Sequence, residues 1–269
     1  MLLKHVVIYW KWETERIVTL DDFIREYKKI KAQGWIKTHR SGPTGVGKTL
    51  EDLLGIPENN RDEPDFGDYE LKSCRLNSQS MLTMFTRAPQ PLRSNTYLRK
   101  KYGYSSDAYD NNEKVLHSTL TAARFASISN TGNQLKIVCD NEKISIASAT
   151  ETENIYWTRE ALQKAFNKKY KNKFVYAKAE NRGVGANEEF HFVEAYEVSG
   201  FDYDAMVSLL EQGKIFVDLR IGQYPDGRTH DHGTGFRIRE ADQPLLFKIR
   251  RQIVWFCEID YTLSETFTS

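Results

Sequence analysis

The stretch Gly42–Arg75, GPTGVGKTLEDLLGIPENNRDEPDFGDYELKSCR, contains two motifs that point to different chemistry. Its beginning, Gly42–Thr49, matches the phosphate-binding pattern G-x-x-x-x-G-K-[ST], which suggests an ATPase. Its end, Pro64–Lys72, has the spacing P-D-x4-E-x-K, which suggests a metal-dependent nuclease. The residues around each motif decide which of the two carries the chemistry.

The context of the glycine-rich motif does not favour nucleotide binding. A working phosphate loop follows a buried strand and opens a helix, so that its backbone N–H groups point at the phosphates. Here the preceding residues, Lys37–Ser41, do not have the pattern of a buried strand, and the helix expected over Thr49–Gly55 is short. We therefore expect no nucleotide cofactor and interpret the glycines as a lead-in loop that turns tightly or approaches a ligand, with a DNA phosphate near Lys48 as one option.

The acidic residues and the lysine of the second motif are spaced for phosphodiester hydrolysis. Asp65 lies at the expected start of a strand, and Glu70 and Lys72 are two residues apart on it, so their side chains leave the strand on one face. Mg²⁺ prefers hard oxygen ligands, and we expect Asp65 and Glu70 to bind it. Lys72 is placed to orient the attacking water and to offset negative charge. Glu51 on the preceding helix is a further catalytic candidate, and a solvated surface carboxylate is the alternative.

The rest of the chain predicts a mixed α/β or α+β protein with a mostly antiparallel sheet. Apolar periodicity and capping residues indicate helices over Thr19–Gln33, Arg159–Tyr170 and Tyr203–Glu211. Two neighbouring apolar runs, Asp68–Arg75 and Met81–Arg87, are expected to form a hairpin.

Four segments within Gly42–Pro89 (TGVGKTLEDLLGI, ENN, PDFGDYELKSCR and MLTMFTRAP) resemble the MvaI/BcnI type of restriction endonucleases, and the resemblance resumes over Val217–Ile238. The first region also resembles, more distantly, the mismatch-repair nicking enzyme MutH. The resemblance implies the PD-(D/E)xK restriction-endonuclease-like fold, a mixed central sheet flanked by helices, with a DNA-recognition sub-lobe. It implies one catalytic set: Glu51, Asp65, Glu70 and Lys72.

Members of this family act as monomers on short, nearly symmetric sites of the form CC-N-GG. The resemblance therefore implies a type II restriction endonuclease that hydrolyses double-stranded DNA with Mg²⁺ and nicks each strand in turn. A MutH-like nicking repair enzyme and a P-loop NTPase are the alternatives. We expect a single nuclease chain over residues 1–269, with a catalytic lobe over about 1–130, its active site at 51–72, and a recognition lobe over about 131–269.

Asp218 and Arg220 place an acceptor and a forked donor on one face of a predicted strand. Arginine suits guanine O6 and N7, and aspartate suits the cytosine amino group, so together they are suited to reading a C·G pair in the major groove. The resemblance places further base-reading residues at His230, His232 and Arg237. His117 is interpreted as a half-buried strand histidine, with a base contact as the alternative.

The net charge of +1 neither indicates nor excludes a nucleic-acid partner, so the distribution of basic residues matters more. Several short basic runs occur, and each run taken alone is explained by a solvated face. Phosphate contacts position a protein on DNA without specifying its sequence. The candidates for such contacts are Lys48, Arg87, Arg93, Arg99 and Lys101.

The composition is that of a globular protein, with 40% hydrophobic residues and 28% charged residues. Three scattered cysteines without a CxxC pair support neither a disulfide framework nor a zinc site, which favours a reduced, cytoplasmic compartment. No apolar run approaches the roughly 20 residues that a membrane span needs, so no membrane partner is expected. The resemblance to restriction endonucleases implies that this compartment is the cytoplasm of a bacterium.

Overall fold

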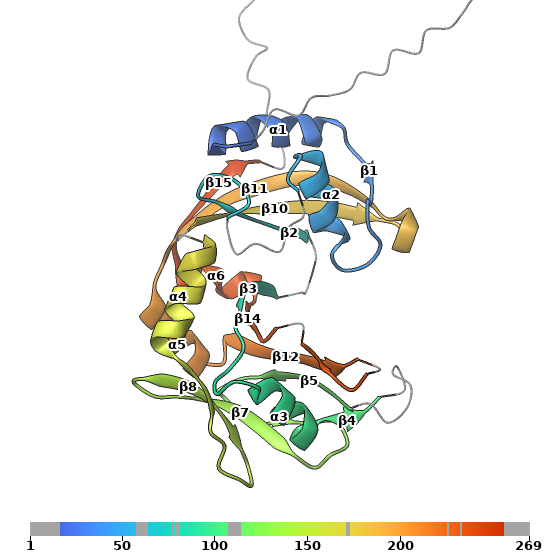
Figure 1. The fold of residues 1–269 in the computed structure, drawn as a ribbon. Helices are drawn as coiled ribbons and strands as arrows, with labels where there is room; N and C mark the ends of the chain where they lie inside the picture. The colour runs from blue at the N-terminus through green and yellow to red at the C-terminus, as the bar shows by residue number, and fades with distance from the viewer. Residues whose placement is uncertain are drawn as a thin grey trace, which may run out of the picture.

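The structure is a computed structural model that describes residues 17–57, 64–76, 78, 81–106, 114–170, 173–224, 226–231 and 233–255. Over these residues the strands form three sheets, and helices pack around them (Figure 1). Among the strand pairs of this part of the chain, β2 and β10 run parallel and the others run antiparallel. The predicted fold class, a mixed sheet flanked by helices, is confirmed.

The first sheet has the strand order β1–β11–β10–β2, and β15 pairs with β11. Its strands are β1 (Ile36–Lys37), β2 (Glu70–Arg75), β10 (Lys173–Arg182), β11 (Glu189–Phe201) and β15 (Phe247–Val254). Helices α1 (Leu20–Ala32) and α2 (Gly45–Leu53) cover one face, and both lie with this sheet in the upper part of Figure 1. The sheet is buried on both sides, because Val175 and Ala177 join the core beneath these helices while Phe174 and Tyr176 join a second core opposite.

The second sheet, in the lower part of Figure 1, has the order β3–β14–β12–β5–β4, and β13 pairs with β12. Its strands are β3 (Leu82–Thr86), β4 (Tyr104–Ser105), β5 (Lys114–Leu120), β12 (Ile215–Gln223), β13 (Thr229–Asp231) and β14 (Gly235–Ile238). A third sheet runs β6 (Ala126–Ser127), β7 (Gln134–Cys139), β8 (Lys143–Ser148), β9 (Ile155–Thr158). The remaining helical elements are α3 (Ser94–Tyr102), α4 (Arg159–Tyr170), η1 (Gly185–Asn187), α5 (Tyr203–Glu211), η2 (Glu240–Asp242) and α6 (Gln243–Leu246).

The hairpin expected between β2 and β3 is wrong. β2 pairs in parallel with β10, whereas β3 pairs with β14 in the second sheet. The two strands also contribute to different cores, because Leu71 belongs to the core beneath α1 and Phe85 to the second core. The short connection after β2 therefore carries the chain from the first sheet to the second.

The boundary expected near residue 130 does not separate the sheets. β2 comes from the first half of the chain and its partner β10 from the second half, with six register pairs between Phe174↔Glu70 and Ala179↔Arg75. Likewise β5 pairs with β12, which follows it by about a hundred residues in the chain. The first and second sheets are therefore each assembled from both halves of the sequence, whereas the third is built from the contiguous strands β6 to β9.

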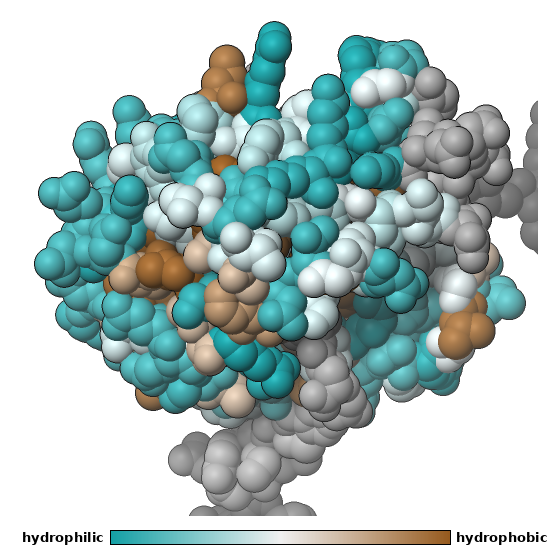
Figure 2. Space-filling view, turned by 90° about the horizontal axis from the view of Figure 1, so that it is seen from below, coloured by the Kyte–Doolittle hydropathy of each residue, from teal (hydrophilic) through white to brown (hydrophobic). Residues whose placement is uncertain are grey.

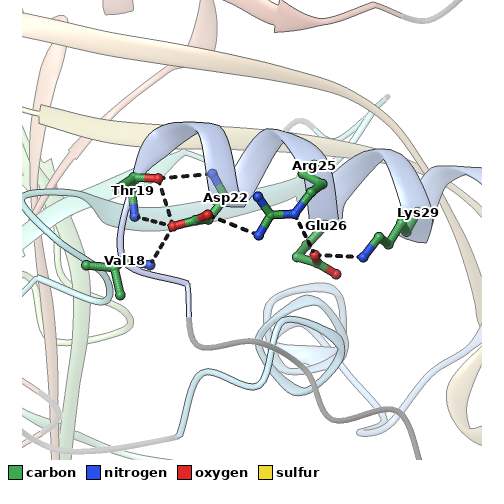
Figure 3. A network of polar contacts seen from close by, with 6 residues as sticks. All are labelled: Val18, Thr19, Asp22, Arg25, Glu26 and Lys29. Atoms are coloured by element: carbon green, nitrogen blue, oxygen red, sulfur yellow. Dashed lines mark hydrogen bonds and ion pairs between the residues drawn. The ribbon is translucent and has the colours of Figure 1, made fainter.

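A capping box begins α1, as the sequence indicated (Figure 3). The Thr19 hydroxyl accepts from the backbone N–H of Asp22, and the Asp22 carboxylate accepts in return from the Thr19 backbone N–H. The Thr19 side-chain and backbone hydrogen bonds lower the pKa of Asp22 to about 2. This cap holds the helix start, so that Phe23 and Tyr27 pack fully buried onto the first sheet.

Figure 2 shows the molecule from below, where the surface is predominantly hydrophilic and apolar residues occur in small groups. Among the described helices, none combines the length and the apolar character needed to cross a membrane. Burial raises the pKa of both Cys74 and Cys139, which are free thiols, and Cys257 lies outside the described residues.

Candidate active site

Strand β2 presents Glu70 and Lys72 on one face, as their spacing predicts. The Lys72 ammonium nitrogen lies 2.5 Å from Glu70 Oε1. The Glu70 side chain is 3% exposed and that of Lys72 is 23% exposed, so the pair leads from the buried sheet towards solvent. A carboxylate and an ammonium held this closely offset each other's charge, and the lysine is left with donors for a further anionic partner.

A tight turn places Asp65 at the start of the same strand. The Asp65 carboxylate accepts a 2.7 Å hydrogen bond from the backbone N–H of Leu71, and Phe66 and Tyr69 form an isolated bridge across the turn. Gly67 has a positive φ of 50°, and a Cβ there would lie 2.5 Å from the Val18 carbonyl oxygen. The turn therefore requires glycine, and it fixes Asp65 against the backbone of the strand that carries Glu70 and Lys72.

Helix α2 supplies Glu51 and Lys48 to a cavity of about 400 Å³ beside β2. Lys72 lines the same cavity, so the structure brings Glu51 and Lys72 together from two different elements. Lys48 also forms a 2.8 Å ion pair with Asp52 one turn further along. Burial raises the pKa of Asp52, but hydrogen bonds from Lys48 and His39 outweigh it, and the net shift is downward.

The glycine-rich motif is not a loop throughout, because α2 begins at Gly45 rather than at the expected Thr49. A Cβ at Gly45 would lie 2.3 Å from the Arg40 carbonyl oxygen, so this glycine allows a close approach of the preceding chain. Gly47 faces β2 instead, with its virtual Cβ 3.5 Å from Ser73 Oγ. Gly45 therefore serves the packing of the helix start, which is a structural reason for glycine at this position of the motif.

Arg75, at the end of β2, binds the start of this motif. Its guanidinium donates to the carbonyl oxygens of Gly42 and Pro43 at 3.1 and 3.2 Å and forms a bidentate pair with Glu188 at 2.6 and 2.7 Å. These hydrogen bonds hold the pKa of the buried Glu188 carboxyl below its usual value. Nothing in the sequence singles out Arg75, because a lone arginine at a strand end gives no signal of its partners.

The second sheet gathers Asp218, Arg220 and Arg237 on one polar face. Asp218 Oδ2 accepts from Arg237 Nη1 at 2.9 Å, and its Oδ1 accepts from the Thr119 hydroxyl at 2.8 Å. Arg220 Nε lies 3.7 Å from the same carboxylate, and the Arg220 side chain is 39% exposed. Asp218 is therefore held on both sides, while Arg220 extends from the sheet towards solvent. Thr119 gave no signal in the sequence, since only the β5–β12 register places it opposite Asp218.

The histidines flank this polar face to different extents. His117 is exposed rather than half-buried, pairs in register with Arg220, and lines a cavity with Asp218 and Arg220. The His230 ring stacks on Tyr224 with centroids 4.4 Å apart. His232 lies outside the described residues. His230 on β13 and Arg237 on β14 lie on strands that both pair with β12, which carries Asp218 and Arg220. We call these four residues, together with Thr119, the reading surface, because base recognition is predicted there.

The candidate phosphate ligands fall into two groups. Arg87 lines a cavity together with Lys72, and Lys48 lines the cavity described above. Arg99 is 3% exposed and donates to the Lys114 carbonyl oxygen and the Gln223 side chain, which contradicts a phosphate contact. Lys101 lies within 2.6 Å of both Glu151 and Glu153, so its charge is already offset. Arg93, exposed at the start of α3, lines neither of the two cavities described beside Lys72.

The comparisons with known proteins agree with this arrangement. The model of the MvaI/BcnI restriction endonuclease family matches residues 24–247. The structure is similar to a restriction endonuclease MvaI–cognate DNA substrate complex, with 30% sequence identity and a TM-score of 0.78 over 87% of this chain and 98% of that chain. It is also similar to MvaI in the absence of DNA, with 30% identity and a TM-score of 0.54 over 86% and 96% of the two chains. The comparison with curated proteins gives no match.

Fold, site and comparisons together define a site-specific deoxyribonuclease of the type II restriction endonuclease class. The chain belongs to the MvaI/BcnI restriction endonuclease family, and the resemblance noted in its sequence is thereby confirmed.

Proposed function

We propose that this nuclease cuts double-stranded DNA at a short, nearly symmetric site of the CC-N-GG type, with Mg²⁺ as cofactor and as a monomer that nicks each strand in turn in the bacterial cytoplasm. The observation that supports it best is the Lys72–Glu70 pair, which lies beside a cavity shared with Glu51. The structure is also similar to MvaI in complex with its cognate DNA substrate, which supports DNA as the substrate.

The carboxylates of this site fit a magnesium ion by their chemistry. The described residues contain no group of three or more His, Cys, Asp or Glu side chains gathered around one point. Mg²⁺ does not need such a cage, because it keeps several waters and is held by one or two carboxylates together with substrate phosphates. Asp65 and Glu70, at the start of β2, are the residues proposed to hold it. When bound, the ion would polarise the phosphate and lower the pKa of a bound water.

The side chains of the protein have separate parts in the hydrolysis. Lys72 donates to the phosphate or to the attacking water, and Glu70 keeps its ammonium group oriented through the 2.5 Å contact. Glu51 faces the same cavity from α2 and is proposed to accept a hydrogen bond from the attacking water. The backbone hydrogen bond to Asp65 fixes that carboxylate, so the set is arranged before the substrate arrives.

Specificity is proposed to come from the polar face of the second sheet. Arg220 has the forked donor and the exposure needed to reach guanine O6 and N7, and Asp218 has the acceptor needed for a cytosine amino group. Thr119 and Arg237 each occupy one lone pair of the Asp218 oxygens, and every carboxylate oxygen has a second lone pair for a base. His230, His232 and Arg237 are proposed to extend the contact along the site.

Supercoiled plasmids with CC-N-GG sites provide the test. We expect Mg²⁺-dependent conversion to nicked circles first and linear DNA later, and no conversion in EDTA. Sequencing the fragment ends gives the site and the central base. Nicked circles that never become linear would favour the MutH-like alternative, and plasmids left intact by the folded protein with Mg²⁺ would refute the proposal.

A further inference from the structure

Helix α4 lines a second cavity that adjoins the active site. This cavity, of about 370 Å³, lies between α4 and the end of β3. It shares Lys72 and Thr83 with the cavity that contains Glu51, so the two are neighbours along one surface. A strand of DNA whose scissile phosphate contacts Lys72 would therefore have its next phosphates close to α4.

The charge of this cavity has one sign. The four ionisable side chains that line it are Lys72, Arg87, Lys164 and Lys168. The other lining residues, which all lie in the described chain, are Thr, Met, Phe or Ala, so the lining itself contains no carboxylate; Glu70, which pairs with Lys72, is not among the lining residues. Cations that converge on a concave surface attract a polyanion and raise its local concentration.

The face of α4 that lines this cavity carries only alanine and lysine. Ala161, Lys164, Ala165 and Lys168 follow the i, i+3, i+4, i+7 spacing of one helix face, and all four line the cavity. A different face of the helix is apolar, because Leu162 and Phe166 are fully buried in the core. Ala165 lies between Lys164 and Lys168 on this face, and Ala161 lies one turn before Lys164. These small side chains leave room for a backbone to approach the helix closely beside the two ammonium groups.

The neighbouring strand end fixes Arg87 against this helix. The Trp157 indole donates to the Arg87 carbonyl oxygen at 2.8 Å, and the Arg87 backbone N–H donates to the Thr234 carbonyl oxygen at 2.9 Å. Both backbone groups of Arg87 are thus held by the protein, while its side chain is exposed at the cavity. The fixed backbone therefore holds the Arg87 side chain at the edge of the cavity.

We propose that Lys164, Lys168 and Arg87 bind the backbone phosphates of the DNA strand that adjoins the scissile phosphate. This inference rests on the proposed function, since it assigns the path of the same substrate. The contacts would be independent of base sequence and would hold the scissile phosphate at Lys72 in register. Ala161 and Ala165 would provide the close approach.

The salt dependence of DNA binding tests this site without any cleavage. Binding of a duplex is measured in EDTA at several salt concentrations for the wild type and for the Lys164→Gln/Lys168→Gln double variant. Each lost phosphate contact reduces the slope of log K against log salt by about 0.9, so the double variant should lose about 2 from the slope. The loss should be equal for a cognate and a non-cognate duplex, because phosphates carry no sequence information.

Three further variants and one small anion complete the test. Lys100→Gln removes an exposed lysine of α3 that lines neither of the two cavities beside Lys72. This variant should leave the slope unchanged. Lys164→Arg/Lys168→Arg should keep the wild-type slope, and Ala165→Glu should weaken binding more than the double glutamine variant. Calorimetry with inorganic phosphate tests the alternative that the cavity binds free anions and not DNA. In that case the lysine substitutions would weaken phosphate binding and leave the salt slope of DNA binding unchanged, which would contradict the inference.

An unchanged slope in the folded double variant would overturn the inference. A wild type that binds duplexes with a steep slope but cleaves none would instead count against the proposed function, so the two failures are distinguishable.

Discussion

The active-site region and the reading surface are built in different ways. The active-site region takes Glu51, Asp65, Glu70 and Lys72 from a single stretch of the chain, and Arg75 ties the two ends of that stretch together. The reading surface takes Thr119, Asp218 and Arg237 from three strands that are distant in sequence and joined by register. The spacing of residues in one stretch therefore determines which side chains form the active-site region, whereas strand pairing determines which side chains form the reading surface.

This difference predicts different consequences of substitution. In the active-site region each side chain has its own proposed part in the reaction, so a loss should abolish cleavage and leave DNA binding. On the reading surface the side chains support one another around Asp218, so a loss should change the choice of site rather than the rate constant of the chemical step. The predictions below separate the two regions, from the largest expected effect to the smallest.

Lys72→Ala should reduce cleavage of a cognate duplex by at least about 10²- to 10³-fold, the range found when one preorganised donor to a developing charge is removed. Binding of the same duplex in EDTA should change far less, because the variant loses one cation among several. Single-turnover cleavage and fluorescence anisotropy measure the two quantities. Lys100→Ala is the matched control and should retain both. A Lys72→Ala variant that cleaves at the wild-type rate would remove Lys72 from the mechanism.

Arg220→Ala should cost about 1–3 kcal/mol of discrimination between the cognate site and a site with one C·G pair changed. Non-cognate binding should be nearly unchanged. Thr119→Val should cause a smaller loss of the same kind, because it removes the 2.8 Å hydrogen bond to Asp218 Oδ1 but no base contact. Competition binding with a panel of single-substituted duplexes measures both. Equal weakening on all duplexes would show that Arg220 contacts phosphate instead of a base.

Arg75→Lys should reduce cleavage by about tenfold, as lysine cannot reproduce the planar fork that joins Glu188 to Gly42 and Pro43. The concentration of Mg²⁺ needed for half-maximal rate should rise, since α2 and Glu51 would be less well held, while the salt slope of binding stays constant. A merely structural role would lower stability without moving the Mg²⁺ requirement. Cleavage as a function of Mg²⁺, beside a urea denaturation curve, distinguishes these outcomes.

The same ion pair predicts a pH dependence of stability. Hydrogen bonds from Arg75 lower the pKa of Glu188, so its stabilisation is fully present above the pKa of an unfolded glutamate and is lost as pH falls through the lower folded value. Glu188→Gln should therefore destabilise by about 2 kcal/mol at neutral pH, and the difference from the wild type should shrink in acid. Denaturation curves at a series of pH values measure it. A difference that grows in acid would contradict the assignment.

Thr19→Ala, which changes neither a candidate catalytic residue nor a residue of the reading surface, should have the smallest effect. It removes the N-cap of α1 and should cost about 0.5–2 kcal/mol of stability. Cleavage rate and site preference should stay unchanged at temperatures where the protein is folded. Thr19→Ser should recover the stability, because serine keeps the hydroxyl that accepts from Asp22. A change in site preference would indicate that α1 influences the second sheet.

Several elements of this fold follow from the sequence. The helix over residues 20–32 follows from its cap and its apolar periodicity, and the shared face of Glu70 and Lys72 follows from the two-residue repeat of a strand. The start of α2 was predicted at Thr49 instead of Gly45. A pattern of small residues does not show whether they contact a ligand or another part of the chain. Gly45 packs against the Arg40 carbonyl oxygen, and this contact exists only in the folded structure.

The sequence by itself indicated the candidate catalytic motif and the family, because both depend mainly on residues that lie close together in the stretch Gly42–Arg75. Tertiary structure alone decided that β2 pairs with β10 instead of β3, that Thr119 supports Asp218, and that the lysines of α4 face the cavity beside Lys72. Strand partners are chosen by the burial of two whole faces at once, to which every strand in the sheet contributes. A local pattern gives the face of a side chain, and only the assembled sheets give its neighbours.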